Sequence, residues 1–139
     1  MNAALLCLVV AIADGDTLTA RCGDPGAYEQ VKVRLAEIDA PEKAQPFGNR
    51  SRQSLAELCF QQQARITPIS TDRYGRTVAR VSCQGTDANL HQVATGMAWA
   101  YTKYLTDPAI KRAEDEAHGA RRGLWRDAEP VAPWEWRKR

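Results

Sequence analysis

The order of strand-like and helix-like segments limits the folds that this chain can adopt. Runs with strand-like alternation are expected at 7–13, 16–22, 31–38, 64–70 and 76–83, and amphipathic helices at 50–63, 87–99 and 107–122. Five strands with one helix between the third and the fourth is the order of an OB-type barrel. We therefore predict an α+β fold, a five-stranded OB barrel with three α-helices.

Turn and cap residues support this order. Asp14-Gly15 stands between the first two runs, and glycine suits the positive φ that a two-residue type I′ turn requires. Asp107 followed by Pro108 is typical of a helix start. The sequence thus predicts a hairpin at the N-terminus and a well-capped last helix.

Length and composition fit one globular domain spanning 1–139, with its core at 7–125 and a Pro/Trp/Arg-rich arm at 126–139. The chain has 139 residues, of which 44% are hydrophobic and 26% charged, as in ordinary globular proteins. The net charge of +2 does not by itself indicate a nucleic-acid binder. No apolar run approaches the roughly 20 residues that cross a bilayer, so no membrane association is expected.

The apolar stretch at 3–13 resembles the middle of an export signal, but basic residues before it and a cleavage site are missing. We interpret 7–13 as a strand and expect any export signal to have been removed or never to have been present.

The arm at 126–139 is expected to pack on the domain. The alternative is that Trp134 and Trp136, next to the basic end of the chain, contact nucleic acid.

Two acids are placed to meet. Asp16 begins the second strand-like run and Asp39 ends the third. If these strands are neighbours, both carboxylates lie at one rim of the barrel and can bind a hard cation such as Ca²⁺ or Mg²⁺. The alternative is that Asp14 and Asp16 only stabilise the turn, as Asx residues commonly do.

An arginine in the middle of the third run strengthens the first interpretation. Val33 and Leu35 point to one face of this strand, and Lys32 and Arg34 to the other. Arg34 either reaches the rim with the acids and a phosphate or lies on a solvated face. Arg76, after the turn DRYG, is a second candidate fork for phosphate; the alternative is an ordinary solvated turn residue.

The stretches DGDT, RLAEIDAPE, TDRYGR, GMAW and GLW occur in this order between 7 and 125. Together they resemble the staphylococcal nuclease (thermonuclease) family. The resemblance implies an OB barrel with three helices and a Ca²⁺-dependent enzyme. It also implies cleavage of phosphodiester bonds in DNA and RNA that leaves 3′-phosphate and 5′-hydroxyl ends.

The resemblance also assigns site residues. The metal ligands fall on the carboxylates of Asp16 and Asp39 and on the backbone carbonyl of Ala40, where a well-known member of the family has threonine. The catalytic residues fall on Arg34, Arg76 and Glu42, the last as general base or organiser of the attacking water. The substrate-binding residues fall on Arg73 (in place of a lysine), Tyr74 and Tyr104. We expect alanine at either catalytic arginine to remove most of the activity and leave the fold intact.

A nuclease-like module that binds nucleic acid without cutting it is the alternative function. Such modules typically lack the metal-binding acids and the arginines, which are all present here. DNA and RNA are the expected partners, no protein partner is expected, and the chain is expected to be a monomer.

The four cysteines, Cys7, Cys22, Cys59 and Cys83, allow three pairings. A turn at Asp14-Gly15 places Cys7 opposite Cys22, in a position that needs a β-bulge to form a bond. The resemblance brings Cys59 and Cys83 together. We predict these two disulfides and hence a secreted or periplasmic protein; the alternative is four free thiols in a cytoplasmic one.

Overall fold

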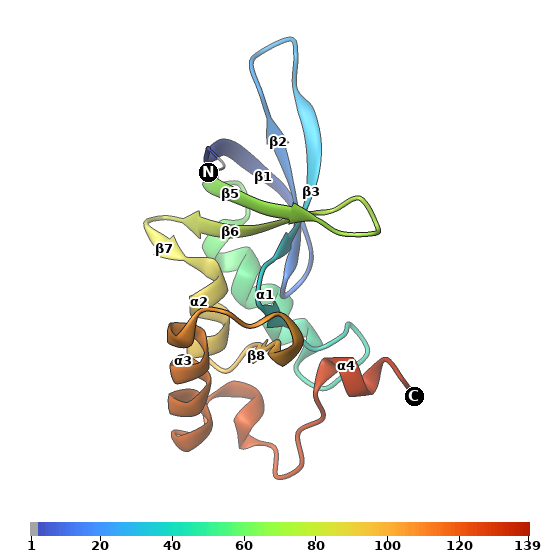
Figure 1. Cartoon of the computed structure of the whole chain (residues 1–139), viewed down its shortest axis with the longest axis vertical. Coiled ribbons are helices and arrows are strands. Elements are labelled where there is room, and N and C mark those ends of the chain that lie inside the picture. The colour runs from blue at the N-terminus through green and yellow to red at the C-terminus, as the bar shows by residue number, and fades with distance from the viewer. Residues whose placement is uncertain (1–2) are drawn as a thin grey trace.

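The computed structural model of the protein describes residues 3–139 (Figure 1). Its strands are β1 (Leu5–Asp14), β2 (Thr17–Cys22), β3 (Glu29–Leu35), β4 (Ile38–Asp39), β5 (Gln63–Thr71), β6 (Thr77–Cys83), β7 (Thr86–Asp87) and β8 (Trp99–Ala100). Its α-helices are α1 (Gly48–Cys59), α2 (Ala88–Ala94), α3 (Pro108–Gly119) and α4 (Pro133–Trp136), and short 3₁₀ helices lie at η1 (Thr102–Tyr104) and η2 (Gly123–Arg126).

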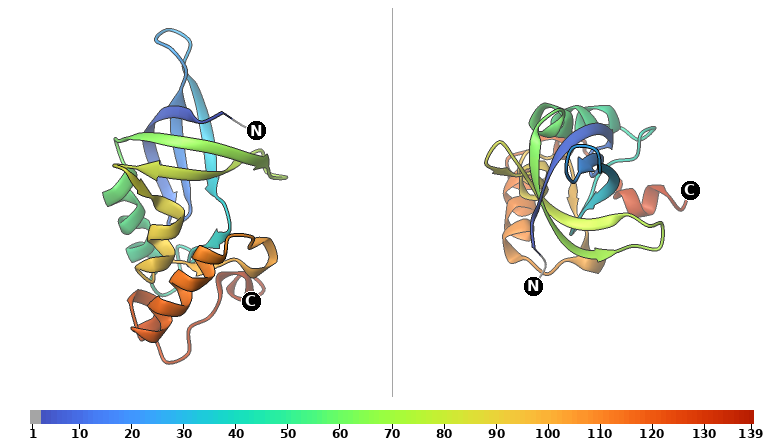
Figure 2. Two further views of the ribbon diagram at one scale, coloured as in Figure 1. Left: turned by 60° about the vertical axis from the view of Figure 1, so that its left-hand side comes forward. Right: turned by 90° about the horizontal axis from the view of Figure 1, so that it is seen from above.

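The predicted barrel is confirmed. The strands follow the order β3-β2-β1-β5-β6, and a parallel pairing of β3 with β6 closes the sheet on itself. The view from above in Figure 2 shows the strands curling around a common centre, with α1 on the outside. Helices α2, α3 and α4 lie at the end of the barrel opposite the tip of the β2–β3 hairpin (Figure 1).

Alternation along the strands builds the core. Val9 in β1, Leu18 in β2 and Val33 and Leu35 in β3 are fully buried, because residues two apart face the same side of a strand. The predicted cap of α3 is also present, since the Asp107 carboxylate accepts a hydrogen bond from the backbone N–H of Ala109 at 2.9 Å. None of the helices within residues 3–139 is long and apolar enough to cross a bilayer.

The first hairpin turns one residue later than predicted. Asp14 pairs with Thr17, so Gly15 and Asp16 form the turn, and Gly15 does not have a positive φ. The prediction of a type I′ turn at Asp14-Gly15 is therefore wrong. Two register shifts, between Ile12 and Asp14 and between Val9 and Ala11, then offset the later turn and restore the predicted pairing farther along the strands.

Both predicted disulfides are present, Cys7–Cys22 and Cys59–Cys83. After the two register shifts, Leu8 lies opposite Arg21, which places Cys7 opposite Cys22 as predicted. The second bond joins the end of α1 to the end of β6. All four cysteines are thus paired, and the alternative of four free thiols does not describe this structure.

The third strand is interrupted, whereas the sequence predicted one run to Ile38. Strand β3 ends at Leu35, and Glu37 takes a left-handed conformation with φ of 68°. The buried amide of Asn89 donates to the carbonyl oxygens of Ala36 and Ala79 at 2.9 and 3.1 Å. This interruption places Asp39 in the separate strand β4, which pairs with β8.

Candidate active site

One guanidinium connects the two acids that the sequence singled out. Asp16 and Asp39 are 5% and 1% exposed. Nη1 of Arg34 lies 3.3 Å from Oδ2 of Asp16, and Nη2 lies 3.3 Å from Oδ1 of Asp39. Oδ2 of Asp16 also accepts a hydrogen bond from the Ala40 backbone N–H at 2.7 Å. The structure therefore brings the three proposed metal-binding residues and Arg34 to one place.

Arg34 also holds the backbone at the interruption between β3 and β4. Its Nη1 donates to the carbonyl oxygens of Leu35 and Ile38, both at 2.9 Å. In the sheet, Arg34 lies between Thr17 of β2 and Val78 of β6. Its side chain is only 13% exposed, so the alternative of a solvated Arg34 is wrong.

The acids near this guanidinium differ in their affinity for protons. Burial, followed by the contact with Asp16, raises the pKa of Asp14 to about 8. Burial opposes ionisation of Asp16 as well, but Arg34 and the hydrogen bonds to Asp16 outweigh it and lower its pKa. Burial and the negative charge of Asp16 keep the pKa of Asp39 raised, although arginines act against them. Because the acids repel one another, a bound cation would stabilise them.

The turn that carries Asp16 is fixed by a buried amide that no sequence motif singles out. Nε2 of Gln92 in α2 donates to the carbonyl oxygens of Gly15 and Ser51 at 2.7 and 3.0 Å. Its Oε1 accepts a hydrogen bond from Oγ of Ser54 at 2.7 Å. Gln92 is fully buried and thus ties the β1–β2 turn to helix α1.

Gly15 is required by close packing, which gives a first prediction. A Cβ atom at this position would lie 1.7 Å from Oγ of Ser51 and 3.0 Å from Cβ of Ala40. We expect Gly15→Ala to lower the free energy of unfolding by about 1–3 kcal/mol, measured by urea denaturation. Gly119→Ala is the matched control, because the space around Gly119 is open, and it should not destabilise the protein. Equal stability of Gly15→Ala and wild type would contradict the packing explanation.

A second group of predicted residues lies in the turn between β5 and β6. Nε of Arg76 donates to Oδ2 of Asp72 at 2.7 Å, and Oδ1 of Asp72 accepts from the Arg76 backbone N–H at 3.0 Å. Slight burial opposes ionisation of Asp72, but these bonds and one from Tyr74 N–H lower its pKa. Asp72 therefore fixes the guanidinium of Arg76 through its Nε atom.

Tyr74 stands exposed beside the two arginines of this turn. The guanidinium carbons of Arg73 and Arg76 lie 4.9 and 5.4 Å from the centre of its ring, and Nη2 of Arg73 donates to the Tyr74 hydroxyl at 2.7 Å. The residue is 67% exposed. Such a surface can offer positive charge to a phosphate and an aromatic face to a base.

Tyr104, the third predicted substrate residue, lies in η1 and is exposed. Its ring packs edge-on against Tyr101 with 5.0 Å between ring centres. Tyr101 in turn stacks on Trp134 of the arm at 5.3 Å. The arm therefore packs on the domain through Trp134, and a contact of Tyr104 with a nucleotide stays a prediction.

Arg137 is a member of this site that the sequence did not indicate. Its Nη1 donates to Oδ1 of Asp39 at 3.1 Å and to Oε1 of Glu42, and its Nη2 donates to Oδ2 of Asp39 at 2.6 Å. The hydrogen bond to Asp39 is the main reason why the pKa of Arg137 is raised. Asp39 and Arg137 are 98 positions apart in the chain, so no local pattern could connect them.

The oxygen donors fit a hard cation with few protein ligands. Two carboxylates and the Ala40 carbonyl are ligand types that Ca²⁺ and Mg²⁺ prefer. Residues 3–139 contain no group of three or more Asp, Glu, His or Cys side chains placed to hold an ion. An ion bound by Asp16 and Asp39 would therefore need the carbonyl, water or a substrate oxygen to complete its coordination.

Comparisons with known proteins identify the family of the chain. Residues 32–127 match the sequence profile described as staphylococcal nuclease homologue. An uncharacterized endonuclease of Haemophilus influenzae is 47% identical over 132 residues, covering 95% of this chain and 72% of the relative. A micrococcal nuclease of Shigella flexneri is 43% identical over 141 residues, covering 94% of this chain and 79% of the relative. A probable staphylococcal-like nuclease of Oryza sativa is 34% identical over 84% of this chain and 35% of the relative. Because the family profile matches most of the chain and the barrel agrees with it, the chain belongs to the staphylococcal nuclease family.

Proposed function

We propose that the protein is a Ca²⁺-dependent nuclease that hydrolyses phosphodiester bonds of DNA and RNA and leaves 3′-phosphate and 5′-hydroxyl ends. The observation that carries the proposal is the guanidinium of Arg34 between the buried carboxylates of Asp16 and Asp39 at the barrel rim. The match to nuclease relatives over most of the chain supports it.

In this proposal Asp16, Asp39 and the carbonyl of Ala40 hold the ion. When bound, Ca²⁺ supplies Lewis-acid chemistry and a template for the phosphate. A small set of protein ligands suits that role, because it leaves coordination positions open for water and a phosphate oxygen. The acids are held ready on two fixed sections of backbone, the turn at Gly15 and the short strand β4.

The arginines supply positive charge where the phosphorane builds up negative charge. Of the two N–H groups on Nη2 of Arg34, one makes a long 3.3 Å contact with Asp39, and the other is proposed to donate to a phosphate oxygen. Arg76 is bound to Asp72 through Nε, which orients its fork toward a ligand. Donors placed for the transition state in this way are a large source of catalysis.

Glu42 takes a proton from the attacking water or orients that water. Its backbone N–H donates to Oε1 of Gln45 at 3.0 Å, and its carboxylate is partly exposed beside Arg137. A carboxylate that is fixed but reached by solvent suits this role. Arg73, Tyr74 and Tyr104 are proposed to contact the nucleotide, because they place positive charge and aromatic faces at the surface.

Digestion assays with the purified protein test the proposal. Labelled single-stranded DNA, duplex DNA and RNA are incubated with Ca²⁺, Mg²⁺ or excess EDTA. We expect Ca²⁺ to support cleavage of DNA and RNA, EDTA to abolish it, and added Ca²⁺ to restore it, because two hard carboxylate ligands meet at the site. Undiminished cleavage in excess chelator would overturn the role of the ion. Tight binding of nucleic acid without cleavage in any ion would indicate a binding module instead.

We propose further that the protein works as a monomer outside the cytoplasm, in the periplasm or secreted. The two disulfides support this location, because such bonds persist in oxidising compartments. Thiol alkylation of protein isolated from its native compartment tests it. Four reactive thiols would contradict the location.

A further inference from the structure

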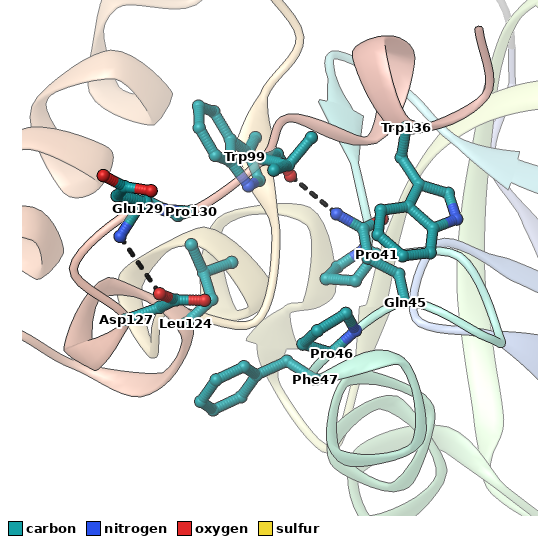
Figure 3. Close-up of a pocket in the computed structure, with 11 residues that line it drawn as sticks. Pro41, Gln45, Pro46, Phe47, Trp99, Leu124, Asp127, Glu129, Pro130 and Trp136 are labelled. Carbon is teal, nitrogen blue, oxygen red and sulfur yellow. Dashed lines mark hydrogen bonds between the residues drawn. The ribbon is translucent and has the colours of Figure 1, made fainter. Parts of the chain in front are cut away.

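The C-terminal arm (residues 126–139) is tied to the loop that carries Glu42. Nε2 of Gln45 donates to the carbonyl oxygen of Val131 at 2.6 Å, the bond drawn in Figure 3. The Oε1 atom of the same side chain accepts from the Glu42 backbone N–H at 3.0 Å. One glutamine thus fixes the arm relative to the loop between β4 and α1 (residues 40–47, the acidic loop).

Aromatic packing holds the short helix α4 of the arm on both sides. Trp134 stacks on Tyr101 with 3° between the ring planes and meets Trp99 edge-on at 5.6 Å. Trp136 lies beside Pro41 and Gln45 in Figure 3, where it lines a small cavity of about 50 Å³. Because Pro41 lies between Asp39 and Glu42 in the chain, the arm rests directly on the acidic loop.

The guanidinium of Arg137, the residue after α4, binds the carboxylates of both Asp39 and Glu42. Its two terminal nitrogens bind both oxygens of Asp39, and one of them also binds Glu42. Asp16 is held by Arg34, which also contacts Asp39, and by the Ala40 N–H. A bidentate guanidinium fixes the plane of a carboxylate as well as its position, and it offsets the repulsion between Asp39 and its acidic neighbours.

We propose that Arg137 is a positioning residue of the active site, supplied by the C-terminal arm, which fixes the carboxylates of Asp39 and Glu42 for the ion and the attacking water. This proposal rests on the proposed nuclease function. It gives the arm a role in the reaction: the barrel supplies Asp16, Asp39 and Arg34, and the arm supplies the group that orients two of the acids. Partners that orient metal ligands in this way typically contribute about 10- to 100-fold in activity or metal affinity.

The test compares Arg137→Ala, Arg137→Lys and the control Arg139→Ala. Arg139 belongs to the same arm, but its guanidinium lies over Trp136 at 4.8 Å rather than on the acids. Steady-state cleavage of single-stranded DNA is measured at saturating and limiting Ca²⁺. Calorimetric titration with Ca²⁺ in the absence of nucleic acid gives a readout that is independent of catalysis.

We expect Arg137→Ala to lower kcat by about 10- to 100-fold with KM changed by less than about threefold, and to bind Ca²⁺ more weakly. Arg137→Lys should recover part of kcat, because it keeps the charge and loses the fork. Arg139→Ala should match the wild type. A wild-type kcat for Arg137→Ala would overturn the proposal. Tighter Ca²⁺ binding, or faster cleavage at limiting Ca²⁺, would also overturn it by showing that the arginine competes with the ion.

One further measurement shows whether the arm is still docked in the variants. Near-ultraviolet circular dichroism reports the stacking of Trp134 on Tyr101, so an unchanged spectrum shows that the arm of Arg137→Ala is still docked. If that spectrum changes, Arg137→Lys decides, since a docked arm with reduced kcat supports the proposal and a wild-type kcat refutes it. A wild-type protein that cuts no nucleic acid in any ion would refute the nuclease function, and the calorimetric comparison would then still test the effect of Arg137 on the acids.

Discussion

Arg34→Ala is expected to lower kcat by at least 10²–10³-fold, the order of magnitude for losing one transition-state donor, and to destabilise the fold. Arg34 contacts both buried acids and two backbone carbonyl oxygens at the β3–β4 interruption. Its removal leaves the buried Asp16 without a cationic partner, whereas Asp39 keeps Arg137, and an uncompensated buried charge typically costs about 3–5 kcal/mol. The sequence alone led us to expect that Arg34→Ala leaves the fold intact. From the contacts in the structure we now expect this variant to be less stable.

Single-turnover cleavage at saturating Ca²⁺ and urea denaturation in EDTA measure the two effects separately. Arg76→Ala is the matched comparison, because Arg76 contacts Asp72 in an exposed turn rather than a buried pair. We expect it to lose kcat by about 10²-fold with little change in the urea midpoint. Arg34→Lys should not restore activity, since a point charge cannot make the same set of bonds. Normal cleavage by Arg34→Ala would remove this residue from the mechanism.

Removal of the Cys59–Cys83 bond is expected to lower the free energy of unfolding by about 3 kcal/mol. The bond closes a chain segment with a sequence separation of 24 and joins the last residue of α1 to the last residue of β6. Its cysteines are fully buried. Cys7–Cys22 spans a separation of 15 within a hairpin that is already paired, so we expect its removal to cost less.

Urea denaturation of the double variants Cys59→Ala/Cys83→Ala and Cys7→Ala/Cys22→Ala measures these losses. A reducing agent added to the wild type should shift its urea midpoint at least as far as the larger of the two double substitutions. Added to the variant that lacks Cys59–Cys83, it should cause only the smaller shift from the remaining bond. If reduction leaves the wild-type midpoint unchanged, the disulfides do not stabilise this fold.

The barrel can be predicted from the sequence because its signals are local. Alternating apolar residues, as at Val33 and Leu35, place a strand face in the core whatever the rest of the chain does. The cap at Asp107 depends on its own helix turn. The pairing of Cys7 with Cys22 depends on one hairpin, and it is correct although the turn is one residue later than predicted, because two register shifts offset that difference. The acids and arginines of the site lie within motifs whose spacing is visible in the chain.

How those residues meet depends on contacts between distant parts of the chain. The turn lies at Gly15 and Asp16, where Gly15 packs against Ser51 of α1, and the third strand is interrupted where Asn89 binds its backbone. Such buried polar groups must find partners, and those partners can lie anywhere in the chain. Arg137 reaches Asp39 across 98 positions, because α4 docks through its tryptophans and thereby brings the end of the chain to the acids. Periodicity and caps report only near neighbours in the chain, so the contact that completes this site appears only when the chain is folded.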